Sequence, residues 1–153
     1  MIKIGALVRS LGSSQLSYYI IKNFNKVAGQ GKVDPIVYCE DVERDCLFAK
    51  FPTMQTVEAW GQEGTIIATS LSTAKKLISY PCPQKRIYYV WDLEWLRKPH
   101  NYIPVLDVFS SDRIKVVARC DNHAKVIENT FNRKVDNIID NFNMEKFLQI
   151  CEE

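Results

Sequence analysis

Short apolar runs of strand length alternate along this chain with amphipathic segments of helical spacing. The apolar runs are rich in valine and isoleucine and contain few polar positions, as expected for strands that are buried on both faces of a sheet. Helices between such strands supply the crossovers that parallel pairing requires. The sequence therefore predicts an α/β protein with a Rossmann-like, doubly wound, mostly parallel sheet of about six to seven strands and helices on both faces. The main predicted strands are 2–8, 34–41, 64–70, 85–92, 114–120 and 135–141.

The intervening helices are marked by residues that favour helix ends. Segment 13–29 should begin at Ser13 or Ser14 and stop at Gly29 or Gly31. A second helix should be opened by Ser72 and ended by the prolines that follow it. Segment 53–60 is predicted to form a further strand, and segment 101–111 is predicted to form an interrupted helical segment. The remaining predicted helices are 72–80, 121–132 and 144–153.

Length and composition favour one soluble domain over residues 1–153, without a second domain. The chain has 153 residues, of which 46% are hydrophobic and 25% charged, an ordinary globular composition. A net charge of +2 gives no bias toward nucleic acid. The N-terminal apolar run is too short for a signal peptide, and no run approaches the about 18 residues of a membrane span. We therefore expect a cytoplasmic protein without nucleic-acid partners.

The cysteines and histidines predict neither a disulfide framework nor a metal site. The five cysteines are scattered and form no CxxC pair, which favours reduced thiols. The two histidines, His100 and His123, have no nearby cluster of ligands. We expect no metal and no cofactor.

Ligands of doubly wound sheets bind at the carboxyl ends of the strands, so the loops there supply the candidate residues. The first such loop opens a helix, where free N–H groups and hydroxyls could hold an anion or a sugar hydroxyl. It lacks the GxGxxG and Walker patterns, and the alternative interpretation is a plain capped turn. The candidates in this loop are Arg9, Ser10, Gly12, Ser13 and Ser14, and Thr69 and Ser70 follow a later strand.

The segment 88–100, YYVWDLEWLRKPH, concentrates aromatic and charged residues just past a strand. Aromatic faces of Trp91 and Trp95 could stack on a sugar or base, and carboxylates accept hydrogen bonds from hydroxyls. Asp92 or Glu94 could act as a general base if its pKa is raised. The alternative is that Tyr88, Val90 and Trp95 belong to the core and the charges are solvated.

The segment 118–126 places Arg119 at a strand end and His123 in the first turn of a helix. Asp121 is also explained by compensation of the helix dipole. Cys120 and His123 are three residues apart, but no orienting acid or oxyanion signature accompanies them. We therefore expect ligand binding rather than nucleophilic catalysis from this segment.

Residues 110–147 resemble the end of the N-terminal domain of GT-B glycosyltransferases, including the short glycosyltransferase-like proteins of large tailed phages. The opening segment 2–24 is similar to the first strand of that domain with its following loop and helix, and segments 64–77 and 88–96 are similar to its central strands. The chain departs from the family by having few glycines in its first loop and Cys120 where serine is common. The positions that carry the resemblance are Arg119, Cys120, His123, Ala124, Ile127, Val135, Ile138, Ile139, Asn141 and Phe147.

The resemblance implies an acceptor-side domain that binds a sugar or nucleotide-sugar ligand, with Asn141 near the crossing into a donor-binding half. The family's donor contacts lie in a second domain, which we expect this chain to lack, so a partner protein or a homo-oligomer is implied for glycosyl transfer. The alternative is a non-catalytic binding or assembly module that kept this half of the fold. A nucleotide-using enzyme of another Rossmann type lacks a fingerprint in this sequence.

Overall fold

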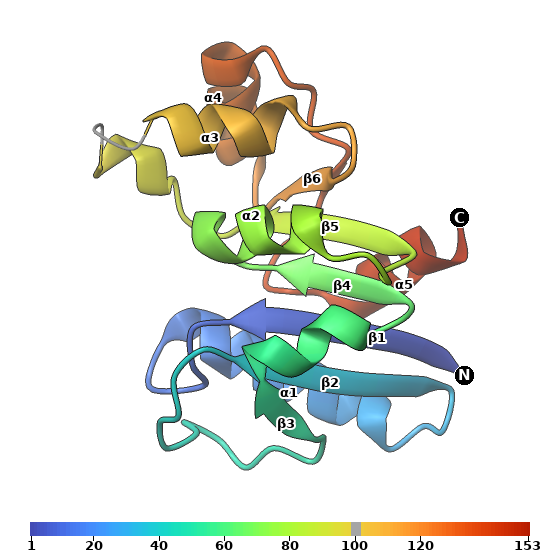
Figure 1. Ribbon diagram of the computed structural model, residues 1–153. Helices are drawn as coiled ribbons and strands as arrows, with labels where there is room; N and C mark the ends of the chain where they lie inside the picture. Colours follow the sequence, from blue (N-terminus) through green and yellow to red (C-terminus); the bar gives the residue numbers. More distant parts are fainter. Residues whose placement is uncertain (99–101) are drawn as a thin grey trace.

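In the computed structural model, which describes residues 1–98 and 102–153, seven parallel strands form one sheet (Figure 1). The strand order is β3-β2-β1-β4-β5-β6-β7, and every neighbouring pair is parallel. This confirms the predicted Rossmann-like α/β class, with a sheet that is wholly rather than mostly parallel in the described residues. The strands are β1 Ile2–Val8, β2 Val33–Cys39, β3 Thr53–Gln55, β4 Thr65–Ala68, β5 Lys85–Val90, β6 Lys115–Ala118 and β7 Asn137–Ile138.

Helices cover both faces of the sheet, as predicted (Figure 1). Helices α1 (Gln15–Ala28) and α5 (Met144–Glu152) bury their apolar sides in one core. Helices α2 (Leu71–Ser79), α3 (Tyr102–Ser110) and α4 (Asp121–Phe131) pack into the core on the other face. Short 3₁₀ segments, η1 Thr56–Gly61 and η2 Glu94–Leu96, complete the described structure. No helix in the described residues is long and apolar enough to cross a membrane.

Each central strand supplies side chains alternately to the two cores, because successive residues of a strand point to opposite faces. In β5, Ile87 and Tyr89 enter the core under α1 and α5, whereas Tyr88 and Val90 enter the core under α2, α3 and α4. All four side chains are fully buried. Burial on both faces explains why the strand sequences are continuously apolar rather than alternating.

Helix α2 begins one residue earlier than predicted, and its N-cap is Ser70 rather than Ser72. The Ser70 hydroxyl accepts a hydrogen bond from the Thr73 N–H at 3.2 Å, and the Thr73 hydroxyl accepts one from the Ser70 N–H at 3.0 Å. This reciprocal pair satisfies two backbone donors at the helix start. For α1, Ser14 is the N-cap and Gly29 the C-cap, in agreement with the prediction.

Three other predicted elements differ from the structure. Of segment 53–60, only the first three residues form a strand, and η1 follows. Helix α3 is continuous from Tyr102 to Ser110, with Pro104 in its first turn, where proline is tolerated. The strand predicted over 135–141 shrinks to the two residues of β7, because Asn141 and Phe142 have φ of 49° and 55° and turn the chain away from the sheet.

The strand order changes direction between β1 and β4. The chain leaves β1 through α1 on one face and leaves β4 through α2 on the other face. The two loops therefore diverge at the carboxyl ends of these neighbouring strands. This topological switch point is where doubly wound folds bind ligands.

Candidate functional site

A pocket of about 430 Å³ lies at the switch point, and we call it the switch-point pocket. Its walls come from the loops after β1, β2, β4 and β5 together with α2 and α3. It brings together four of the residues predicted from the sequence: Arg9, Ser70, Glu94 and Trp95. In the part of the chain that the structure describes, the lining is Arg9, Glu40, Ser70, Leu71, Ser72, Lys75, Glu94, Trp95, Lys98, Pro104 and Val105.

Glu94 is the carboxyl group of this pocket that is best suited to proton transfer. Its Oε2 accepts hydrogen bonds from the Leu71 N–H at 2.8 Å and from the Tyr88 hydroxyl at 3.5 Å. Its Oε1 has no hydrogen-bond partner among the described residues. Burial raises the pKa of Glu94, and the neighbouring Asp92 adds to the rise, while the hydrogen bond from Leu71 opposes it. A raised pKa and an uncommitted oxygen are the properties of a general base.

Asp92, the other predicted base, does not line the switch-point pocket. Its Oδ2 forms an ion pair with Arg97 Nη1 at 3.0 Å, and both side chains are substantially exposed. The carboxylate is thus already neutralised on the surface. Of the two carboxyl groups in this segment, only Glu94 faces the pocket.

The two tryptophans of the segment have different environments. Trp95 is 5% exposed and packs edge-on against Phe109 and Phe131, so it belongs to the core as well as to the pocket wall. Its indole Nε1–H is buried and has no acceptor among the described residues. The ring of Trp91 is covered by the Arg119 guanidinium, which lies 4.0 Å from the ring centre. A ligand could stack on that face of Trp91 only by displacing Arg119.

Arg119 and His123 form a separate group at the ends of β5 and β6, outside the switch-point pocket. Arg119 Nη1 donates to the Trp91 carbonyl at 3.3 Å. Burial lowers the pKa of His123, and the positive charge of Arg119 lowers it further. His123 is therefore favoured in its neutral form. His100, at which no metal site is expected from the sequence, lies outside the described residues.

The turn between β1 and α1 already holds a carboxylate of this chain. The Ser10 hydroxyl donates to Glu43 Oε2 at 2.9 Å, and a Cβ atom placed on Gly12 would lie 2.1 Å from the same oxygen. The Ser14 hydroxyl caps α1 by accepting from the Ser17 N–H. Glu43 therefore occupies the place in which the sequence predicted an anion or a sugar hydroxyl.

The other predicted ligand-binding residues have structural contacts or lie elsewhere. Thr69 is buried, and its hydroxyl donates to the Leu7 carbonyl at 2.8 Å. Ser13 is exposed and makes no side-chain hydrogen bond with the described residues. Asn141 lies in the turn after β7, and its carbonyl accepts from the Asn23 side chain at 3.1 Å. None of these three residues lines the switch-point pocket.

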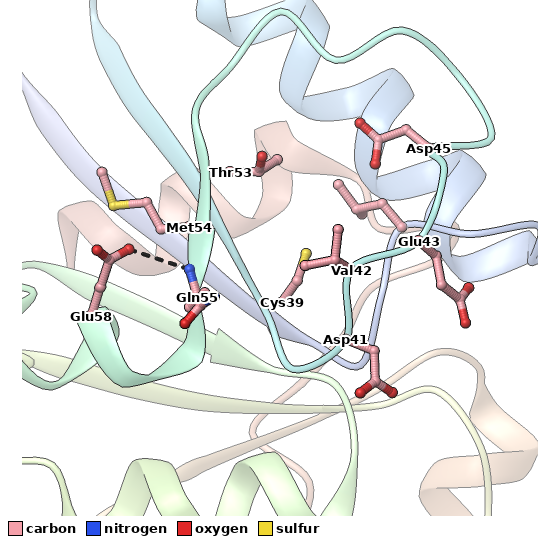
Figure 2. Close-up of a pocket in the computed structure, with 10 residues that line it drawn as sticks. Cys39, Asp41, Val42, Glu43, Asp45, Thr53, Met54, Gln55 and Glu58 are labelled. Atoms are coloured by element: carbon pink, nitrogen blue, oxygen red, sulfur yellow. Dashed lines mark hydrogen bonds between the residues drawn. The ribbon is translucent and has the colours of Figure 1, made fainter.

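A second pocket, of about 510 Å³, lies at the carboxyl ends of β2 and β3 and is acidic (Figure 2). Figure 2 shows that the carboxylates of Asp41, Glu43 and Asp45 point in different directions. Glu58 turns toward the Gln55 N–H, which donates to it at 3.2 Å. In the part of the chain that the structure describes, no group of three or more His, Cys, Asp or Glu residues could hold a metal ion.

Lys75 and Lys98 are pocket residues that were not predicted from the sequence. The available signal was the spacing of Ser72 and Lys75, which places both on the same side of α2.

Comparisons with protein-family models, curated proteins and solved structures find no match for this chain. The fold and the pocket thus define a Rossmann-like α/β protein with a polar site at the switch point.

Proposed function

We propose that this chain is a glycosyltransferase-like protein of the GT-B type that binds a sugar or nucleotide-type ligand in the switch-point pocket, with Glu94 as general base. The observation that carries the proposal is the Glu94 carboxyl group, which has one uncommitted oxygen and a raised pKa beside the hydroxyls of Ser70 and Ser72. Hydroxyl-bearing rings need such acceptors and donors together with an apolar wall. Leu71, Trp95, Pro104 and Val105 supply that wall.

In the proposed reaction, Glu94 Oε1 removes the proton from an acceptor hydroxyl. The hydroxyl oxygen forms a bond to the anomeric carbon of the donor sugar, and the bond between that carbon and the donor's phosphate oxygen breaks. The nucleoside diphosphate leaves with the bonding electrons. The donor half of the site is expected from a partner chain or a second copy, as the resemblance to GT-B domains implies.

The second candidate function is a non-catalytic binding or assembly module. The observation that favours it is that both carboxyl groups of the segment have structural partners. Glu94 Oε2 caps the start of α2 through the Leu71 N–H, and Asp92 pairs with Arg97. In this case the pocket binds its ligand and no glycosyl group is transferred.

Titration calorimetry against a panel of nucleotide sugars and their acceptor sugars tests the binding. Mass spectrometry of the acceptor, with candidate partner chains present, tests the transfer. We expect Glu94→Gln to keep ligand binding and to lose at least about 100-fold in transfer rate, the usual range for a general base. The matched control is Glu152→Gln, an exposed residue at the end of α5. Binding without transfer in every combination would favour the non-catalytic module, and silence across the panel would reject both functions.

A further inference from the structure

We propose that the ligand of the switch-point pocket carries a phosphate group, which is held by Lys75, Lys98 and Ser72. The preferred ligand is then a sugar phosphate or a nucleotide rather than a neutral sugar. The sugar part of this inference rests on the proposed function, whereas the phosphate seat rests on the charges and donors of the pocket itself.

The charges of the pocket do not balance. Its charged side chains within the described residues are three cations, Arg9, Lys75 and Lys98, and two carboxylates, Glu40 and Glu94. Charges outside the pocket neutralise two of them, since Lys76 Nζ lies 2.7 Å from Glu40 and Asp41 lies 3.2 Å from Arg9. Lys75 and Lys98 have no ion-pair partner within the described residues. Two cations therefore face one carboxyl group, and a ligand anion would balance the excess positive charge.

A hydrogen-bond donor without an acceptor among the described residues lies beside these lysines. At the start of α2, the Leu71 N–H is taken by Glu94 and the Thr73 N–H by Ser70. The Ser72 N–H between them has no acceptor among the described residues. Ser72 and Lys75 are three residues apart and lie on the same side of the helix, where the helix dipole also favours an anion. A phosphate oxygen can accept from the Ser72 N–H and hydroxyl while the ammonium groups of the two lysines neutralise its charge.

Apolar residues form another part of the pocket wall. Trp95 lines the pocket, is 5% exposed, and has a buried Nε1–H without an acceptor among the described residues. The Nε1 atom is covered by protein atoms, so Trp95 contributes the accessible part of its ring to the pocket wall. Pro104 and Val105 supply apolar surface next to it. The pocket thus combines a site for an anion with an apolar wall against which a ring can pack.

The neighbouring helix start does not compete for the same group. At the turn between β1 and α1, the Glu43 carboxylate already accepts from Ser10 and lies over Gly12. A phosphate at that turn would have to displace Glu43 and would meet its negative charge. Of these two helix starts, that of α2 is the one open to an anion.

The test follows the three tryptophan indole N–H signals and the backbone amides by ¹H–¹⁵N NMR during titration. The probes are inorganic phosphate, glucose 1-phosphate and glucose. The variants are Lys75→Gln, Lys98→Gln and Ser72→Ala, and the control is Lys125→Gln, an exposed lysine on α4. We expect phosphate and glucose 1-phosphate to shift the Trp95 indole and Ser72 amide signals. Each pocket lysine variant should weaken phosphate binding about tenfold, and Lys125→Gln should not weaken it.

The outcomes separate this inference from the proposed function. Glucose binding as tightly as glucose 1-phosphate, unaffected by the lysine variants, overturns the phosphate seat and leaves the proposed function standing. Binding of inorganic phosphate that depends on Lys75 and Lys98, without binding of either sugar, supports the seat and counts against the proposed function. Phosphate shifts confined to the amides of Ser10 and Gly12 overturn the phosphate site, and so does the absence of shifts with every probe. The proposed function is decided separately by the calorimetry with nucleotide sugars.

Discussion

The carboxylate of Glu94 accepts a hydrogen bond from the Leu71 N–H at 2.8 Å, which joins the loop after β5 to the first residue of α2. The two residues are 23 positions apart in the sequence, so this cap is a tertiary contact. It satisfies a backbone donor that no residue within α2 can satisfy. The same side chain therefore fixes the pocket wall with one oxygen and presents the other oxygen for chemistry.

Replacement of Glu94 should separate these two roles. Glu94→Ala leaves the Leu71 N–H without its acceptor and should lower the free energy of unfolding by about 1–2 kcal/mol. Glu94→Gln keeps a carbonyl acceptor and should stay within about 0.5 kcal/mol of the wild type. Urea denaturation at neutral pH measures both values. Equal destabilisation by the two variants would show that the Leu71 contact is not what Glu94 contributes to stability.

The pH dependence of stability should also reveal the burial of Glu94. Because burial raises its pKa in the folded state above the ordinary value of 4.5, the folded protein binds this proton more tightly than the unfolded chain. The contribution of this proton to the free energy of unfolding is fully present below pH 4.5 and is lost as the pH rises through the folded-state pKa of Glu94. The difference in unfolding free energy between wild type and Glu94→Gln should therefore fall as the pH rises from 4.5. Urea denaturation of the two proteins across this range measures the difference, and a flat or rising difference would contradict the assignment.

The sequence was sufficient for the fold because its strands are continuous apolar runs, which occur where a parallel sheet is buried on both faces. It overestimated the last strand. Residues after β7 are held by Tyr89, whose hydroxyl donates to the Ile139 carbonyl at 2.6 Å and accepts from the Phe142 N–H at 3.3 Å. This contact spans about 50 residues of sequence, and periodicity within the segment carries no information about it.

The candidate site was predicted in part, for a topological reason. Arg9, Ser70, Glu94 and Trp95 follow strands, so the rule that ligands bind at strand ends selected them. Lys75 lies inside a helix, and its place in the pocket depends on how α2 is rotated against the sheet. Glu43 lies in an irregular loop, and its hydrogen bond to Ser10 spans 33 residues. Neither position follows from local sequence, because the spacing of Ser72 and Lys75 shows that they share a side of the helix but not what that side faces.

The contact between Glu43 and the β1–α1 turn predicts coupling between two substitutions. In Gly12→Ala the new Cβ would lie 2.1 Å from Glu43 Oε2, so the carboxylate must move and its hydrogen bond with Ser10 is lost. The Glu43 side chain is exposed and flexible, so the cost should stay below about 1.5 kcal/mol. In a Glu43→Ala background the same Gly12→Ala change should cost less. A double-mutant cycle by urea denaturation measures the coupling, and strict additivity would exclude the contact in solution.

The positive charge of Arg119 should hold down the pKa of His123. Arg119→Met removes that charge while retaining much of the side-chain volume, and it should raise the pKa of His123 toward the ordinary value of 6.5. Burial, the larger cause of the lowering, should keep the pKa below that value. Titration of the His123 ring protons by NMR measures the change. Lys125→Met, on the same helix as His123, is the control. An equal pKa shift of His123 in both variants would contradict a specific effect of the Arg119 charge.

The lowered pKa of His123 also has a consequence for stability. His123 in the unfolded chain takes up a proton near pH 6.5, whereas in the folded protein it does so only at lower pH. Its contribution to the free energy of unfolding is therefore fully present above pH 6.5 and is lost as the pH falls toward the folded-state pKa. His123→Asn should remove this part of the acid sensitivity. Unfolding free energies of wild type and variant at pH 7.5 and at about pH 5.5 test the sign. A variant that loses as much stability as the wild type over this interval would contradict it.

Two glycines with positive φ should respond differently to alanine. Gly64 has φ of 89°, and a Cβ there would lie 2.5 Å from the Lys3 carbonyl oxygen, a backbone atom that cannot move aside. Gly31 has φ of 67° but faces open space. Gly31→Ala should therefore cost about 1 kcal/mol for the left-handed backbone alone, and Gly64→Ala more than about 2 kcal/mol. Chemical denaturation of both variants measures the difference, and equal losses would show that the close approach of Lys3 to the turn before β4 does not constrain Gly64.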